Sequence, residues 1–492
     1  MQKQIRRVGF GLLVAFLAVF AQLNYVQIFA ADSIAGRPAN FRSLIREYGV
    51  KRGRILTVDF ETIAASRATR GDLKYERTYP GGELYGHITG WYSIVYGTSR
   101  IERTFNDQLL GEGGVLSMQD LQDRFLGSGE RGDDVRLTIH SGLQEAARDA
   151  LGDERGSIVA LDPQTGEVRA MWSNPSFDPS PLASHVTRDA RQYWESLEPE
   201  STQSPLLHLA TSRGYPPGST FKVVTTAAAL ESGRYRPSST FDDPVELELP
   251  LTTETLTNFT KTSCLGGGQI DLFKALTVSC DTTFATIGLE IPDEVREGAE
   301  GFGFNGPIPF DVPTESSTFP DIADDNAPLR AFAAIGQGDV IATSLQMALV
   351  AAGVANGGEV PRPRLVQEVI DPSGGIVERF APETLGRAMS VETASEVARM
   401  MVSVVQDPSG TGAAARIEGT TVAGKTGTAQ TGVEGANPHT WFIAFAPAND
   451  PQLAIAVIVE NGGSFGSEAT GGAVAAPIAR AVLEADRRIR GW

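Results

Sequence analysis

Short apolar runs recur along the chain and predict most of its regular structure. Those with β character lie at Ser157–Leu161, Glu167–Trp172, Trp441–Ala446 and Leu453–Glu460. A turn sequence, residues 162–166, separates the first two and predicts a hairpin. Residues 471–490 have helical periodicity and a basic last turn. Hairpins combined with internal helices and a closing helix predict an α+β fold for residues 151–492.

The region before residue 150 has a different pattern. Its β-like runs, Arg54–Val58, Ile88–Tyr96 and Val135–Ile139, are short and separated by glycine-rich turns. Residues 30–150 are therefore predicted to form a small, irregular, β-containing module. Its early arginines are expected at the protein surface; they are Arg42, Arg46, Arg52 and Arg54.

The first thirty residues predict a membrane anchor. Lys3, Arg6 and Arg7 precede an apolar run, Val8–Ala21, which an amphipathic stretch extends to Phe29. We expect residues 8–29 to cross the cytoplasmic membrane once, because basic residues stay on the inner side. Residues 1–7 would then be a cytoplasmic tail, and the rest would lie outside. The alternative is a cleaved signal peptide.

A serine and a lysine three residues apart offer the first candidate chemistry. Residues 215–218 read Tyr-Pro-Pro-Gly and interrupt regular structure, and an apolar, alanine-rich run, Val223–Leu230, predicts a buried helix behind them. Ser219 and Lys222 would share one face of its first turn. A lysine whose pKa is lowered by burial could take the serine proton. The alternative is a helix-capping serine beside a solvated lysine.

Composition limits the other possibilities. A formal net charge of -18 argues against a nucleic-acid partner. The five histidines show no metal-ligand spacing, and two cysteines are too few for a zinc module, so we predict no metal and no cofactor. Cys264 and Cys280 could form a disulfide in an exported domain, and two unpaired thiols are the alternative.

Two further motif matches are excluded by the rest of the sequence. Residues 419–426 fit a phosphate-binding loop, but the glycines and proline within residues 427–440 prevent the helix that such a loop requires. Residues 462–466 fit a nucleophile elbow, but every histidine lies before Ser464, which is the wrong chain order for an α/β hydrolase.

Three short motifs stand in order along the chain. They are Ser-Thr-Phe-Lys at 219–222, Ser-Cys-Asp at 279–281 and Lys-Thr-Gly-Thr at 425–428. Together they resemble the active-site motifs of penicillin-binding proteins and serine β-lactamases. Arg52-Gly-Arg-Ile55 resembles a motif of the pedestal domain of class B penicillin-binding proteins. The chain is most similar to the actinobacterial class B enzymes of septal and polar growth.

This resemblance implies a fold and a domain order. A transpeptidase domain with a helical part and an antiparallel sheet would span residues 151–492, behind a β-rich pedestal at residues 30–150. The chain departs from the family at one motif position, where Asp281 replaces the usual asparagine. A carboxylate accepts hydrogen bonds but cannot donate them, so Asp281 could instead pair with Lys222.

The resemblance also implies a reaction, peptidoglycan D,D-transpeptidation. Ser219 would attack the stem peptide, Lys222 would act as general base and Ser279 would relay a proton. Backbone amides of Ser219 and Thr428 would hold the oxyanion. Lys425, Thr426, Gly427 and Thr428 would complete the substrate site, with Lys425 supplying positive charge.

The expected partners follow from that reaction. They are peptidoglycan stem peptides on lipid-linked precursor, β-lactam antibiotics, the membrane, a glycosyltransferase and divisome proteins. Two alternatives remain open: a β-lactamase or D,D-carboxypeptidase of the same fold, and a non-enzymatic β-lactam sensor or scaffold.

Overall fold

The computed structural model describes residues 2–24, 45–71, 73–113, 131–250, 252–323, 325–433 and 435–492. Its larger part is built on a five-stranded antiparallel sheet with the strand order β17-β18-β19-β7-β8. The strands are β17 (Ala423–Ala429), β18 (His439–Ala446), β19 (Leu453–Val459), β7 (Gly156–Leu161) and β8 (Val168–Asn174). The predicted β7–β8 hairpin is present, and the predicted α+β fold is confirmed.

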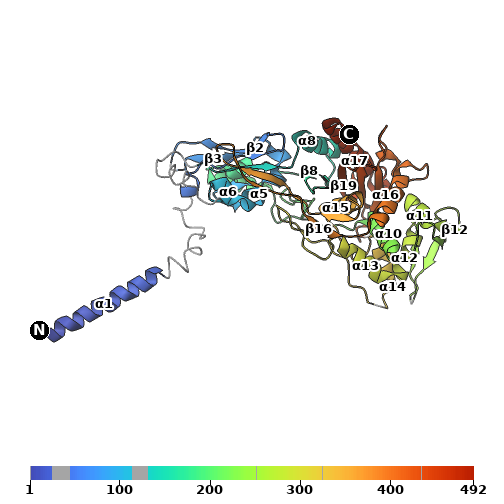
Figure 1. Ribbon diagram of the computed structural model, residues 1–492, viewed down its shortest axis with the longest axis horizontal. Coiled ribbons are helices and arrows are strands. Elements are labelled where there is room, and N and C mark those ends of the chain that lie inside the picture. Colours follow the sequence, from blue (N-terminus) through green and yellow to red (C-terminus); the bar gives the residue numbers. More distant parts are fainter. Residues whose placement is uncertain are drawn as a thin grey trace.

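Both faces of this sheet are buried, which explains the unbroken apolar runs in its strands. Alternate residues of β19 contribute to two separate hydrophobic cores, Ala454 and Ala456 to one and Ile455 and Val457 to the other. Helices α8 (Ser141–Leu151) and α17 (Ala475–Arg490) cover one face, and α15 (Ser344–Ala355) and α16 (Val391–Gln406) cover the other (Figure 1).

The helices that carry the first two motifs and their neighbours lie on the α15–α16 side of the sheet. They are α10 (Lys222–Glu231), α11 (Leu272–Val278), α12 (Asp281–Glu290), α13 (Pro292–Gly301) and α14 (Ala327–Ala334). Helix α10 packs against α12, α13 and α16, and α16 packs against β17. The first and second motifs are thereby brought to the β17 edge of the sheet, where the third motif lies.

A second, six-stranded sheet forms the other end of the molecule. Its order is β15-β14-β6-β1-β2-β3. Four strands come from the N-terminal region: β1 (Ile55–Leu56), β2 (Thr62–Ala68), β3 (Tyr75–Thr78) and β6 (Asp134–Leu137). The other two, β14 (Val366–Ile370) and β15 (Ile376–Arg379), come from late in the chain and lie among the N-terminal elements in Figure 1. The N-terminal region and a late segment of the chain therefore share this sheet.

One predicted strand in the N-terminal region is partly wrong. Ile88 lies in a short helix, α4 (Gly86–Thr89), and only β4 (Tyr92–Ser93) is extended within the predicted run. Gly86 explains the difference, because a Cβ there would approach the carbonyl oxygen of Phe177 to 2.1 Å. Close packing of this helix on a distant segment overrides the local β preference.

The surface prediction for the early arginines is also wrong at one position. Arg52 is 3% exposed, and its Nε donates to the Glu102 carboxylate at 2.6 Å. The Arg77 Nε donates to the other Glu102 oxygen, also at 2.6 Å. We refer to Arg52, Arg77 and Glu102 as the pedestal trio. Burial is tolerated here because the carboxylate is paired on both oxygens. Arg42 lies outside the described residues.

The N-terminal helix, α1, runs from Gln2 to Asn24 and lies apart from both sheets (Figure 1). Many of its apolar side chains are exposed, among them Phe10, Leu12 and Phe16. The predicted span, residues 8–29, falls partly outside the described residues. Within the described part of the chain, no helix reaches the length and apolar character needed to cross a membrane.

Candidate active site

The predicted nucleophile lies in a tight turn that leads into a buried helix. Ser219 is half-buried in a 3-10 turn, η4 (Gly218–Phe221), and α10 begins at Lys222. Gly218 has a φ of 53°, a left-handed conformation that favours glycine. Its amide donates to the Gly336 carbonyl at 2.8 Å, and a Cβ on Gly336 would clash with the Gly218 oxygen at 2.3 Å. The two glycines fix this turn.

The turn packs directly on the third motif. A Cβ on Gly427 would lie 2.9 Å from both the Pro217 carbonyl oxygen and the Thr220 side chain. The space above Gly427 is therefore filled by the chain itself. The Trp441 indole donates to the Pro216 carbonyl at 3.0 Å and reinforces this contact. Gly427 thus allows the turn that carries Ser219, which we call the nucleophile turn, to approach strand β17.

Lys222 points from α10 towards the second motif and is fully buried. Its Nζ donates to Asp281 Oδ1 at 2.7 Å and to the Ser279 carbonyl oxygen at 2.8 Å. A longer contact of 3.4 Å joins it to Ser279 Oγ. The sequence left open whether Lys222 pairs with Asp281 or with Ser279, and in the structure it contacts both.

Ser279 stands between two lysines. Its Oγ accepts a 2.8 Å hydrogen bond from Lys425 Nζ in addition to the contact with Lys222. Ser279 follows α11 in a left-handed conformation, φ 62° and ψ 43°, which is uncommon for a residue with a Cβ. This conformation places the hydroxyl between the two cations, where it can pass a proton.

We refer to Lys222, Lys425 and Asp281 as the catalytic trio. Burial lowers the pKa of Lys222, while the charge of Asp281 and the hydrogen bond to it raise it, and the net shift is downward. Burial lowers the pKa of Lys425 well below its usual value, and the positive charge of Lys222 lowers it further. Neutral amines are therefore favoured here relative to a lysine in water.

The threonines of the third motif are held by neighbouring loops. Thr426 Oγ1 shares a 2.6 Å hydrogen bond with Thr411 Oγ1. Thr428 Oγ1 accepts a 3.3 Å hydrogen bond from the Gly471 amide. Both threonines lie on β17, the edge strand of the sheet, and β17 faces the nucleophile turn across that edge. An extended substrate would meet the site at this edge.

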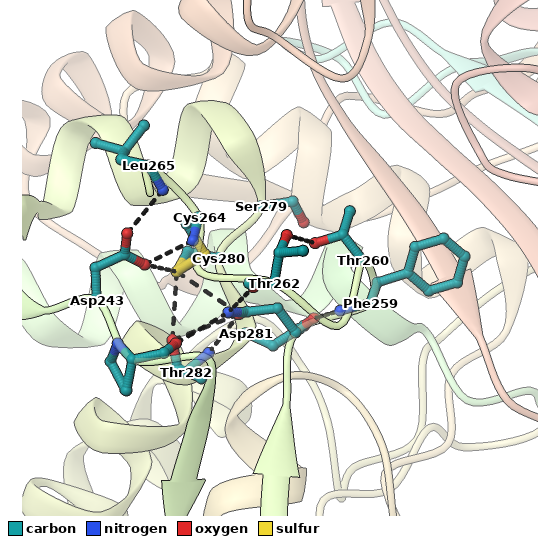
Figure 2. Close-up of a disulfide and its surroundings, with 12 residues drawn as sticks. Asp243, Phe259, Thr260, Thr262, Cys264, Leu265, Ser279, Cys280, Asp281 and Thr282 are labelled. Atoms are coloured by element: carbon teal, nitrogen blue, oxygen red, sulfur yellow. Dashed lines mark hydrogen bonds between the residues drawn. A yellow bond between two sulfur atoms is a disulfide. The ribbon is translucent and has the colours of Figure 1, made fainter. Parts of the chain in front are cut away.

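The two cysteines form a disulfide that includes the middle residue of the second motif. Cys280 follows Ser279 directly, and the bond joins it to Cys264 in the loop between β11 (Thr255–Thr257) and β12 (Gln269–Asp271) (Figure 2). The carboxylate of Asp243 accepts hydrogen bonds from the amides of Cys264 and Leu265, both at 2.7 Å. This loop is therefore fixed against the turn that carries Ser279.

The two rejected motif matches have other roles in the fold. Lys425, which would end the phosphate-binding pattern, lies in strand β17 and not at the start of a helix. Ser464 is exposed in an irregular segment, η6 (Glu460–Glu468), and its amide donates to Glu154.

Sequence reasoning missed several residues that support the site. The Phe259 amide donates to Asp281, and the Asn258 side-chain oxygen accepts from the Thr282 amide directly after the second motif; both residues lie in a loop that carries no motif. Glu460 accepts a 2.7 Å hydrogen bond from the Tyr215 hydroxyl, four residues before Ser219, and is paired with Arg155 at 2.8 Å. The Tyr-Pro-Pro-Gly sequence drew attention to Tyr215, but no local pattern identifies its distant partners.

Comparison of the chain with known proteins identifies its family. The model of the penicillin binding protein transpeptidase domain matches residues 156–484, and that of the penicillin binding protein A dimerisation domain matches residues 52–135. The chain belongs to the penicillin-binding protein transpeptidase family. The resemblance to penicillin-binding proteins that the three motifs carried is confirmed, and so is the resemblance to class B enzymes that the Arg52-Gly-Arg-Ile55 motif carried.

Within this family, the chain is similar along almost its whole length to proteins named PbpA. The peptidoglycan D,D-transpeptidase PbpA of Mycolicibacterium smegmatis is 41% identical over 499 residues, covering 99% of both chains. The protein of the same name from Mycobacterium tuberculosis is 38% identical over 494 residues, again covering 99% of both. A solved acyl-enzyme complex of M. tuberculosis penicillin-binding protein A with ceftriaxone has a TM-score of 0.84 and 38% identity, covering 90% of this chain and 99% of that one.

Proposed function

We propose that the protein is a peptidoglycan D,D-transpeptidase that works through an acyl-enzyme on Ser219 and is acylated there by β-lactams. The observation that carries this proposal is the meeting of all three motifs: Ser279 Oγ lies 2.8 Å from Lys425 Nζ and 3.4 Å from Lys222 Nζ. Both lysines are buried, so each holds its proton less firmly than in water. Relatives covering 99% of the chain carry the same activity in their names.

The first half of the reaction forms the acyl-enzyme. Ser219 Oγ attacks the carbonyl carbon of the penultimate D-alanine, and Lys222 accepts the hydroxyl proton. The negative charge that develops on the carbonyl oxygen is held by the backbone amides of Ser219 and Thr428. Ser279 then passes a proton to the nitrogen of the departing D-alanine, the C–N bond breaks and the peptide remains as an ester on Ser219.

The second half resolves that ester. An amine of a neighbouring stem peptide attacks the ester carbon and forms the new amide bond. The bond to the Ser219 oxygen breaks, and the proton that the amine loses is returned to that oxygen. In the first half, Lys425 balances the terminal carboxylate of the donor, to which the hydroxyls of Thr426 and Thr428 also donate, and this carboxylate leaves with the D-alanine. Gly427 belongs to the same strand and keeps the nucleophile turn close to it.

The placement of the chain in the cell is part of the proposal. Residues 1–7 would lie in the cytoplasm, residues 8–29 would anchor the chain in the membrane, and the pedestal (30–150) and transpeptidase domain (151–492) would lie outside. The exposed apolar side chains of α1 support this arrangement. A glycosyltransferase and divisome proteins are the expected partners, with a role in cell division. The disulfide fits an oxidising, extracytoplasmic compartment.

The test is an assay of the purified protein on an acyl-D-alanyl-D-alanine donor with and without an added amine acceptor. We expect D-alanine release with both donor hydrolysis and amine-linked product, the product rising with acceptor concentration. The Ser219→Ala variant should release no D-alanine. Donor hydrolysis that does not change when the amine is added would favour a carboxypeptidase. A wild type that releases no D-alanine would favour a sensor or scaffold.

A further inference from the structure

A loop outside the three motifs is tied to the second motif at several points. We call residues 258–264 the clamp segment. The Phe259 amide donates to Asp281 Oδ2 at 3.0 Å. The Asn258 side-chain oxygen accepts from the Thr282 amide at 3.1 Å. The disulfide joins the end of the segment, Cys264, to Cys280. Figure 2 shows Phe259 and Cys264 beside the turn that carries Ser279 and Asp281.

The Asp281 carboxylate connects the clamp segment to the catalytic base. Its Oδ1 accepts from Lys222 Nζ at 2.7 Å, and its Oδ2 accepts from the Phe259 amide. An asparagine has only one acceptor oxygen, and its NH2 group can only donate. With an NH2 group in place of one carboxylate oxygen, an asparagine could not accept from both Lys222 and the Phe259 amide at the two positions that Oδ1 and Oδ2 occupy. The aspartate at this position therefore matches the presence of the clamp segment.

The clamp segment also helps to hold the unusual backbone conformation of Ser279. Ser279 holds a φ of 62° between α11 and α12, and such a backbone persists only where its surroundings enforce it. Asn258 and Phe259 hold the first turn of α12 directly after this strained residue. A loosened α12 start would move the Ser279 hydroxyl relative to Lys222 and Lys425.

We propose that Asn258 and the Phe259 amide are positioning groups of the acylation reaction, holding Asp281 and Ser279 against the two lysines. This proposal rests on the proposed function of Ser219. The side chain of Phe259 points away from Asp281 in Figure 2 and is 62% exposed. Its contribution to positioning therefore comes from the backbone N–H alone, and the side chain can be replaced.

This difference between backbone and side chain gives a matched pair of variants. Phe259→Pro removes the N–H, whereas Phe259→Ala keeps it. Proline is compatible with the local fold, because the Lys261 amide donates to the Asn258 carbonyl at 2.8 Å and closes a turn in which Phe259 is the second residue. Neither Phe259 nor Thr260 has a positive φ. The pair thus isolates one hydrogen bond.

The measurement is the rate of acylation of the full-length protein by a fluorescent penicillin, followed across pH. We expect Phe259→Pro to slow acylation about tenfold, the effect of losing one hydrogen bond to a charged group. Phe259→Ala should match the wild type. Because a released carboxylate no longer supports the Lys222 ammonium against burial, the rise of the rate with pH should begin at lower pH in Phe259→Pro.

Two further variants keep the result interpretable. Asn258→Ala should act in the same direction as Phe259→Pro. Combining Phe259→Pro with Asp281→Asn should slow acylation by less than the product of the two single effects, because both break the same contact. A thermal melt of each variant identifies those that fail to fold.

The outcomes separate the two proposals. A wild type that forms no adduct with the penicillin contradicts the proposed function itself. A wild type that is acylated, with a folded Phe259→Pro variant acylated at the same rate and with the same pH profile, overturns the positioning role alone.

Discussion

The pedestal trio and the catalytic trio bury the same set of charges, two cations around one carboxylate. In the pedestal trio the cations are arginines, and each donates at 2.6 Å to a different oxygen of Glu102. In the catalytic trio they are lysines, and only Lys222 contacts the carboxylate. Lys425 instead donates to Ser279 Oγ.

The difference lies in whether a proton can leave. A guanidinium stays charged in proteins, so the pedestal trio is a fixed ionic contact. A buried ammonium gives up its proton more readily. Lys425 has no carboxylate contact among the described residues, and burial together with the charge of Lys222 lowers its pKa well below the usual value. We infer that arginine suits a structural role here and lysine a catalytic one, although the charges are equal.

The most severe test of this comparison makes the catalytic trio resemble the pedestal trio. Lys222→Arg keeps the positive charge beside Asp281 but removes the ability to act as a base. We expect acylation by a fluorescent penicillin to fall about 10²–10⁴-fold, the usual contribution of a general base. An unchanged rate with a normal thermal melt would show that Lys222 acts only as a charge.

The next test removes the carboxylate of the pedestal trio. Glu102→Gln leaves two buried arginines without a counter-charge, and such a change costs about 3–5 kcal/mol of unfolding free energy. Urea denaturation measures it. Acylation per folded molecule should remain at the wild-type level, since Glu102 lies in the pedestal.

The same variant tests a pH dependence. Burial raises the pKa of Glu102, but the charges of Arg77 and Arg52 outweigh burial and lower it overall. A carboxyl whose folded pKa is lowered adds stability that is present above its usual pKa and lost as the pH falls through the folded value. The wild type should lose this stability in acid, and Glu102→Gln should lack that loss.

A smaller effect is expected from Arg77→Lys. The lysine keeps the charge, but its single nitrogen cannot reproduce the two separate donors of Arg77, Nε to Glu102 and Nη1 to the Gly53 carbonyl at 2.5 Å. We expect a loss of about 1–3 kcal/mol in urea denaturation, the cost of one unpaired buried group. Arg67→Lys, at an ion pair whose arginine is exposed, is the matched control and should change little.

Asp281→Asn should also displace the pH profile of acylation, in addition to the slowing expected from the lost contact with Phe259. The Asp281 charge raises the pKa of Lys222 against the larger effect of burial. Without that charge the pKa falls further, so neutral Lys222 persists to lower pH and the acylation rate should begin to rise at lower pH. A rise that begins at the wild-type pH would contradict the assignment of Lys222 as base.

The sequence predicted the structure best where a short segment carries the signal by itself. The apolar runs of β18 and β19 predicted strands because both faces of that sheet are buried. The three motifs predicted which side chains meet. The burial of Arg52 was not predictable, because its partner Glu102 lies 50 residues away and no local pattern links them.

The remaining gaps have similar causes. β14 and β15 join the pedestal sheet from late in the chain, and a strand pattern does not tell which sheet receives it. The Phe259 contact to Asp281 uses a backbone amide, which every residue except proline has. Ser219 was predicted in the first turn of an α-helix, but the tight contact of Gly218 with Gly336 gives a 3-10 turn instead.

The most direct test of the account is the mass of the protein after a short exposure to penicillin G. We predict an increase equal to one intact penicillin, persistent over many minutes and located on the peptide that contains Ser219. Ser219→Ala should show no increase. A wild type with no adduct, or an adduct on another residue, would contradict the claim that Ser219 is the acylation centre.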